Sequence, residues 1–187
     1  MKKKGLILIV FVVGLIFSWM LIPQDRADGV GARAQQITTE ERKLTEQKEK
    51  LADWVYQHSE KISKKIAREI VDASYPYKNA LLLLAIFEME SNFVPSAISR
   101  KGARGLGQVH WSSHEKVLAE TGICKQERDL FDPETNVRAS NLILVDMLDR
   151  SNGDVIKALR LYLGCHNGAY TMRVLNNYVQ LSMLTGT

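Results

Sequence analysis

The stretch NALLLLAIFEMESNFVPSAISRKGARGLGQ, at residues 79–108, decides the fold of this chain and points to its chemistry. Residues 79–91 are nearly all apolar until Glu88 and are rich in Leu and Ala. This favours a buried helix, although periodicity alone does not exclude a buried strand. Glu90 lies at the end of that apolar segment. Because a low dielectric disfavours the charged form of a carboxyl group and raises its pKa, Glu90 is a candidate proton donor to a leaving oxygen.

Helical patterns also cover the rest of the chain from residue 37 onward. The expected helices cover 38–57, 59–74, 79–91, about 112–120, 133 to about 149, 155–163 and roughly 170–184. Asp132 before Pro133 is a strong helix start, because Asp is a favoured N-cap and Pro fits the first helical position. Asp154 is expected to cap the next helix, and Thr38 with Glu41 fits a capping box. Strand signals are scarce, so the sequence predicts an all-α fold.

The N-terminus has the pattern of a membrane segment. Three lysines at residues 2–4 precede an uncharged run over residues 5–22, which as a helix would span about 27 Å. We therefore expect residues 1–22 to be an uncleaved signal anchor in the bacterial inner membrane, with the rest of the chain exported to the periplasm. The alternatives are a cleaved signal peptide, which would give a secreted protein, and a cytosolic protein with a buried apolar helix.

Three segments are expected after the anchor. Residues 23–36 contain two glycines and no apolar pattern, and we expect a flexible linker there. Residues 37–58 form a charged helix, which is either a short coiled-coil stalk for a partner or a solvated helix that packs on the domain. Residues 59–187 are expected to form the catalytic domain.

Charge, histidine and cysteine content narrow the function classes. The net charge is +4 and part of it lies at residues 2–4, so the exported part lacks the clustered basic surface that binds nucleic acid. His110 and His114 have the spacing of metal ligands, but no third ligand is evident, and we expect no metal or cofactor. Cys124 and Cys165 could form a disulfide in an oxidising compartment, worth about 3–4 kcal/mol. Two buried free thiols are the alternative.

Four blocks of sequence, in this order, resemble the lytic transglycosylase (SLT) branch of the lysozyme-like superfamily. The blocks are Glu90-Ser91 with Phe93 and Pro95, Ser99 to Gln108, Leu130 to Asn136, and Ala158 to Gly164. Any one of them alone would be weak, but four in the correct order over about residues 60–180 are specific. The resemblance implies a helical, goose-type or SLT lysozyme-like domain that cleaves bacterial cell-wall glycan.

The resemblance also implies roles for particular residues. Glu90 matches the catalytic acid and base. Ser99 and Gln108 match residues that line the groove beside it, where they bind the sugar's acetamido group or shape the site. Tyr162 matches a tyrosine whose hydroxyl sits near the catalytic carboxyl group. Glu88 would point to a different part of the helix surface, so it takes a structural or solvent-facing role.

Two positions in these blocks depart from the family pattern, and one block is expected to be structural. Gly107 stands where a bulkier residue, often methionine, is common, and the departure is expected to widen a subsite. Leu163 stands where asparagine is common, and the nearby Asn167-Gly168 could take over part of that turn's role. The third block is expected to start a core helix, with Asn136 fixing a turn.

The implied reaction cleaves the β-1,4 bond between N-acetylmuramic acid and N-acetylglucosamine. Glu90 protonates the glycosidic oxygen, the substrate's acetamido group stabilises the developing charge, and Glu90 then acts as base towards the muramyl 6-hydroxyl, which yields a 1,6-anhydro product. A muramidase that uses water, with Asp129 or Asp132 as its second carboxylate, is an alternative. A binding module that attaches a secretion or conjugation apparatus to the wall is another, and such a machine is also the expected partner of an active enzyme.

Overall fold

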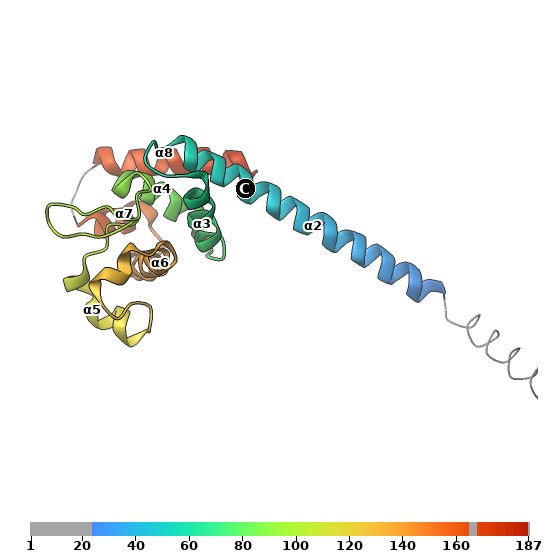
Figure 1. The fold of residues 1–187 in the computed structure, drawn as a ribbon, viewed down its shortest axis with the longest axis horizontal. Helices are drawn as coiled ribbons and strands as arrows, with labels where there is room; N and C mark the ends of the chain where they lie inside the picture. Colours follow the sequence, from blue (N-terminus) through green and yellow to red (C-terminus); the bar gives the residue numbers. More distant parts are fainter. Residues whose placement is uncertain (1–23, 165–167, 187) are drawn as a thin grey trace, which may run out of the picture. The chain divides into compact units, whose positions relative to one another are not determined.

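The computed structural model describes residues 24–164 and 168–186, in which every regular element is a helix (Figure 1). The elements are α2 (Gln24–Gln57), α3 (Lys64–Ser74), α4 (Ala80–Ser91), α5 (Trp111–Glu120), the 3-10 helix η1 (Glu127–Phe131), α6 (Pro133–Arg150), α7 (Val155–Leu163) and α8 (Gly168–Thr185). β-type pairing in these residues is limited to two isolated bridges, which join Ile98 to Arg104 and Arg104 to Val109. The predicted all-α fold class is confirmed.

The two helix starts predicted at aspartates are both N-caps in the structure. The Oδ2 atom of Asp132 accepts a hydrogen bond from the N–H of Thr135 at 2.8 Å. The Oδ1 atom of Asp154 accepts one from the N–H of Lys157 at 3.0 Å. Each cap satisfies a backbone donor that the first turn of a helix leaves without an intrahelical partner.

The chain divides into two compact units, residues 1–44 and 45–187. The first unit contains the first half of α2, which is helical from Gln24. The flexible linker predicted for 23–36 is therefore wrong for 24–36, because two glycines cost only about 1 kcal/mol each while the surrounding alanines and glutamines favour helix. The capping box predicted at Thr38 is also wrong. The helix runs through Thr38, whose hydroxyl donates to the carbonyl oxygen of Gln35 at 2.9 Å.

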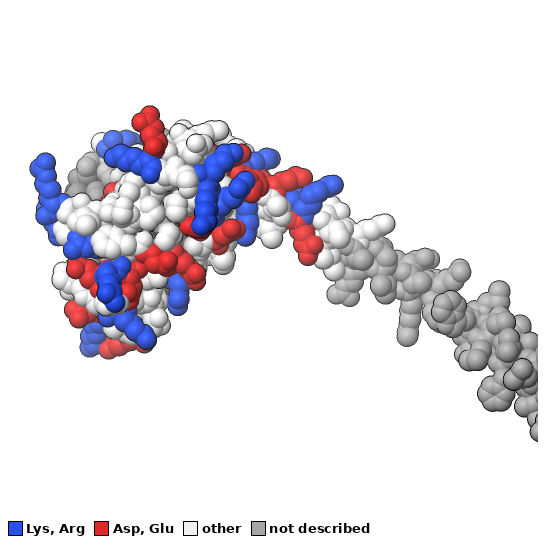
Figure 2. Space-filling view, in the orientation of Figure 1, with Lys and Arg blue, Asp and Glu red and all other residues white. Residues whose placement is uncertain are grey.

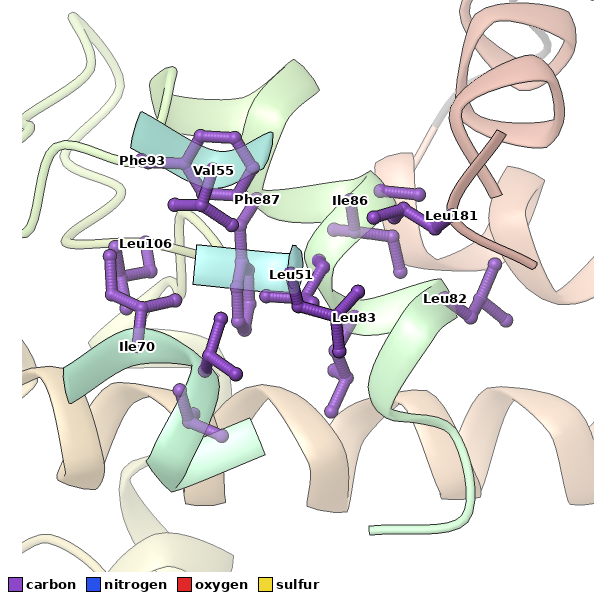
Figure 3. Close-up of a cluster of buried hydrophobic side chains, with 14 of the residues drawn as sticks. Leu51, Val55, Ile70, Leu82, Leu83, Ile86, Phe87, Phe93, Leu106 and Leu181 are labelled. Carbon is purple, nitrogen blue, oxygen red and sulfur yellow. The ribbon is translucent and has the colours of Figure 1, made fainter. Parts of the chain in front are cut away.

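The second half of α2 belongs to the core of the second unit. Leu51 and Val55 are completely buried there (Figure 3), and Trp54 is nearly so. The compact unit therefore begins at residue 45, before the start predicted for the catalytic domain at residue 59. Of the two alternatives for 37–58, the helix that packs on the domain holds for residues 45–57, whereas residues 35–44 are exposed. The sequence pattern missed this because the apolar stripe of α2 is narrow until Leu51.

Helix α4 lies at the centre of the second unit and contacts α3, α6 and α8. Its side chains are buried on all sides from Leu82 to Phe87 (Figure 3). A helix that is apolar all round must be covered on all sides, and the neighbouring helices do this. The long apolar run at residues 80–87 is thus the core of the domain, and the buried-strand alternative is excluded.

Ion pairs join the second half of α2 to α3. Lys48 lies 2.8 Å from Asp72, and Arg68 lies 2.9 Å from Glu49. These pairs are largely solvent-exposed, so each contributes little, on the order of 0–1 kcal/mol. On the face shown in Figure 2, Lys and Arg side chains are interspersed with Asp and Glu.

Two predictions fall on residues outside the described part of the chain. The predicted anchor at residues 5–22 is one, and among the residues that the structure describes, no helix is long and apolar enough to cross a membrane. The predicted disulfide is the other, because Cys165 is not described. Cys124 is buried, with its Sγ atom 3.1 Å from the carbonyl oxygen of Gln126.

Candidate active site

Glu90 occupies the last turn of α4, immediately before the chain turns away from the helix. Asn92 caps the helix in the left-handed conformation, with φ of 53°, and its N–H donates to the carbonyl oxygen of Glu88. The next residue, Phe93, is also left-handed, with φ of 59°, and is completely buried. Non-glycine residues rarely adopt this conformation, and strain of this kind persists where packing over-determines the backbone. The buried ring of Phe93 thus fixes the direction in which the chain leaves Glu90.

The carboxyl group of Glu90 is partly buried and accepts a hydrogen bond from a tyrosine hydroxyl. The hydroxyl of Tyr170, on α8, donates to the Oε1 atom of Glu90 at 2.5 Å. Burial raises the pKa of Glu90 above its ordinary value, and the hydrogen bond from Tyr170 lowers it, with burial the larger effect. The result is a carboxyl group that keeps its proton to a higher pH than an exposed glutamate does.

An open cleft of about 390 Å³ lies beside Glu90. The residues that line it are Glu90, Ser99, Arg100, Lys101, Ala103, Gly107, Gln108, His110, Tyr162 and Leu163. All four residues that the sequence predicts for the site, Glu90, Ser99, Gln108 and Tyr162, thus line one cleft. Among the described lining residues, Glu90 has the only carboxyl group.

Ser99 and Gln108 both hold the loop between α4 and α5 in shape. The Oγ atom of Ser99 accepts a hydrogen bond from the N–H of Ala103 at 3.0 Å. The Nε2 atom of Gln108 donates to the carbonyl oxygens of Gly105, at 3.0 Å, and Ala97, at 3.4 Å. Gln108 is itself left-handed, with φ of 50°. Both side chains therefore shape the wall of the cleft, and the hydroxyl of Ser99 can still donate to a ligand.

The predicted role of Tyr162 was to place a hydroxyl near the carboxyl group of Glu90, and in the structure two tyrosines share this region. The hydroxyl of Tyr162 donates to the carbonyl oxygen of Gly107 at 3.0 Å, while Tyr170 bonds Glu90. The pKa of Tyr162 is raised, chiefly by burial and also by the nearby charge of Glu90, so its phenol stays protonated. Tyr170 was not predicted as a site residue. The signal that could have found it is a tyrosine on the apolar side of a helix, because a buried tyrosine hydroxyl needs a partner.

Asn136 fixes the glycine-rich turn of the cleft from behind. It is completely buried in the first turn of α6. Its Nδ2 atom donates to the carbonyl oxygens of Leu130, at 2.7 Å, and Arg104, at 3.1 Å, and its Oδ1 atom accepts from the N–H of Gly107 at 2.9 Å. The amide therefore ties the backbone next to Gln108 to α6, as the prediction that Asn136 fixes a turn requires.

The absence of a side chain at Gly107 does not widen the cleft, contrary to the prediction. A Cβ atom at this position would run into the side-chain oxygen of Ser140 and lie 2.6 Å from the hydroxyl of Tyr162. The missing side chain points into packed protein, and the space is taken by Ser140 and Tyr162. Leu163, the other departure, places an apolar side chain in the cleft wall, while Asn167 lies outside the described residues.

The other candidate acids lie elsewhere. Asp132 caps α6, and Asp129 accepts hydrogen bonds from the N–H groups of Lys125 and Gln126 in the turn before η1. Glu88 does not line the cleft. The side chain of Glu88 is half-buried, and this burial raises its pKa, while nearby His58 lowers it. In the described residues, no group of three or more metal-ligating side chains comes together.

A helical domain that presents one partly buried carboxyl group at the end of a core helix, in an open cleft, has the architecture of a lysozyme-like domain. Residues 57–173 match the family model described as "Transglycosylase SLT domain", and this chain belongs to that family. Membership supports a transglycosylase-type enzyme with lytic activity on peptidoglycan in general. No curated protein and no solved structure among those compared matches the chain.

Proposed function

We propose that this protein cleaves the β-1,4 bond between N-acetylmuramic acid and N-acetylglucosamine in peptidoglycan and forms a 1,6-anhydro-muramyl end, with Glu90 as the acid and the base. The observation that carries the proposal is the environment of Glu90. Its carboxyl group is partly buried, has a raised pKa and lines an open cleft of about 390 Å³. A protonated carboxyl group in that position can donate its proton to the leaving oxygen.

The second step uses the same residue. Once Glu90 has lost its proton, the hydroxyl of Tyr170 stabilises the carboxylate through the bond to Oε1. The carboxylate then takes the proton of the muramyl 6-hydroxyl, whose oxygen attacks the anomeric carbon within the same sugar. Hydrolytic glycosidases usually need a second carboxylate, either as nucleophile or to activate water. Among the described residues of the cleft there is no second carboxylate, and the two aspartates considered for that role serve as helix and turn caps.

A pair of glutamine substitutions on α4 tests this function. Purified cell wall is incubated with the protein, and soluble muropeptides are measured. Glu90→Gln should abolish their release, because glutamine cannot give or take the proton. Glu88→Gln, two residues away on the same helix, should retain it. Equal release by wild type and Glu90→Gln would refute the proposal, and equal loss in both variants would point to a folding defect that circular dichroism would detect.

We also infer a place and a partner for this activity. The basic flank and apolar run at residues 1–22 support an inner-membrane anchor with the domain in the periplasm. The exposed helical residues 35–44 are available to a partner such as a secretion or conjugation complex, for which the enzyme would open the wall locally. Crosslinking in cells followed by purification of the protein tests this, because failure to recover any envelope-complex component would contradict the partner.

A further inference from the structure

The loop between α4 and α5 carries two basic residues at the tip of a tight turn. The N–H of Gly102 donates to the carbonyl oxygen of Ser99 at 3.0 Å. Arg100 and Lys101 are therefore the two central residues of a β-turn. The N–H of Ser99 donates to the carbonyl oxygen of Ala103, and the N–H of Ala103 donates to the Oγ atom of Ser99, each at 3.0 Å. Five consecutive residues are therefore held in one shape, and the two basic side chains project from a fixed base.

Both basic residues line the same cleft as Glu90 and are solvent-exposed. Within the described part of the chain, neither of them has an ion-pair partner, whereas Arg104, in the same loop, pairs with Glu127 at 3.0 Å. In Figure 2, Lys and Arg side chains extend from the left edge of the view, where Figure 1 places this loop. With Glu90 as the only carboxyl group among the described lining residues, the cleft carries a positive charge that the protein itself does not neutralise.

Resting on the proposed function, we propose that Arg100 and Lys101 bind the carboxylates of the peptide stems on muramic acid, so that the enzyme prefers peptide-bearing glycan over bare glycan. The N-acetylated sugar rings of the glycan carry no charge of their own. The peptide stem is attached to the muramyl residue whose glycosidic oxygen Glu90 protonates, and it carries free carboxylates. Guanidinium and ammonium groups at a cleft mouth attract such groups, and Arg can bind a carboxylate with two hydrogen bonds.

The size of the effect follows from the exposure of both cations. Solvent-exposed ion pairs contribute modestly, so the loss of both charges should weaken binding by about 3- to 10-fold. The attraction is screened by salt, since charges in water interact only weakly beyond the Debye length of about 10 Å at moderate ionic strength. The preference for peptide-bearing glycan should therefore shrink when salt is added to the wild type.

Sedimentation of the full chain with insoluble cell wall tests the proposal without cleavage, in a Glu90→Gln background. Three walls are compared: intact wall, wall whose stem carboxylates have been chemically amidated, and wall stripped of its stems by an amidase and then amidated at the lactyl carboxylates that the stripping exposes. The test variant is Arg100→Gln/Lys101→Gln. The matched control is Lys116→Gln/Arg128→Gln, which removes the same charge from exposed positions that do not line the cleft.

The wild type should bind intact wall about 3- to 10-fold more tightly than either treated wall, a range set by two exposed ion pairs. The test variant should lose this difference, and the control variant should keep it. Equal binding of intact and amidated wall by the wild type would overturn the proposal, and so would an equal loss in the two double variants. Because the readout is binding, an enzyme that released no muropeptides would refute the proposed reaction and still leave this comparison decisive for the basic turn.

Discussion

Glu90 is subject to two opposing effects, and their balance sets the pH range in which it can act. Burial favours the protonated form, which the first step needs, and the hydrogen bond from Tyr170 favours the carboxylate, which the second step needs. Because burial is the larger effect, the pKa of Glu90 is raised. The activity that depends on the acid form should be present at low pH and decline as the pH rises through that raised pKa.

Replacement of Tyr170 by phenylalanine should move this decline. Without the hydroxyl the carboxylate loses its stabilising partner, so the pKa of Glu90 rises further and the alkaline limb of kcat/KM shifts to higher pH. The maximum rate should fall about 10- to 100-fold, in line with the loss of a group that stabilises the catalytic base. Tyr178→Phe, on the same helix, is the control. An alkaline limb that stays in place, or moves to lower pH, would contradict the role of Tyr170.

At this scale the sequence predicted the residues that lie in recognisable blocks. Glu90, Ser99, Gln108 and Tyr162 stand within such blocks, and the structure places them around one cleft. Tyr170 was missed because it lies 80 positions from Glu90 in an ordinary helical pattern. Only the packing of α8 on α4 brings the two together. The sequence also could not predict why position 107 is a glycine, since the reason is that a Cβ atom there would point into Ser140 and Tyr162.

Helix α6 and the turn that contains Gly107 are joined by one buried amide, and Asn136→Ala should break that junction. The change leaves the N–H of Gly107 and the carbonyl oxygens of Leu130 and Arg104 without this partner. Buried polar groups without partners cost about 1–3 kcal/mol each, so the free energy of unfolding should fall by at least about 2 kcal/mol. Chemical denaturation measures this, with Asn176→Ala, an exposed position on α8, as the control. A loss under about 0.5 kcal/mol, typical of a surface substitution, would contradict the assignment.

Element by element, the helices with clear local signals were predicted well. Asp132 and Asp154 mark their helices because the caps depend on neighbouring residues alone. Residues 24–36 were predicted to be a flexible linker because glycines disfavour helix, but they are helical. The helical preference of the neighbouring residues is individually small and is spread over many positions. The short helix η1 has no periodic pattern, and it is held by a capping box between Gln126 and Asp129.

At the scale of the whole molecule, the residues that match the family model span a shorter range than the residues that form the folded unit. The match covers residues 57–173, but Leu51 and Val55 before it and Leu181 after it are completely buried. Gln47 also connects α2 to the ends of two other helices, through Thr185 at 3.2 Å and Tyr75 at 2.9 Å. The sequence could not show this, because the burial of one face of α2 depends on contacts with residues far along the chain.

A fragment that starts at residue 58 should therefore fail to fold, and one that starts at residue 45 should fold. The shorter fragment lacks several buried side chains of α2, and the loss of even one large buried side chain costs about 2–5 kcal/mol. The sum approaches the total stability of a domain, about 5–15 kcal/mol. Thermal unfolding followed by circular dichroism compares 58–187 with 45–187. Cooperative unfolding of both at the same temperature would contradict this boundary.

The central claim is that Glu90 cleaves the glycan without a second carboxylate and without water as the nucleophile. Digestion of purified cell wall by the full chain in water enriched in heavy oxygen, followed by mass spectrometry of the muropeptides, tests it most directly. The account predicts 1,6-anhydro-muramyl ends that carry no heavy oxygen and that disappear with Glu90→Gln. Reducing muramyl ends that carry one heavy oxygen atom would show that water attacks the sugar, and would contradict the account.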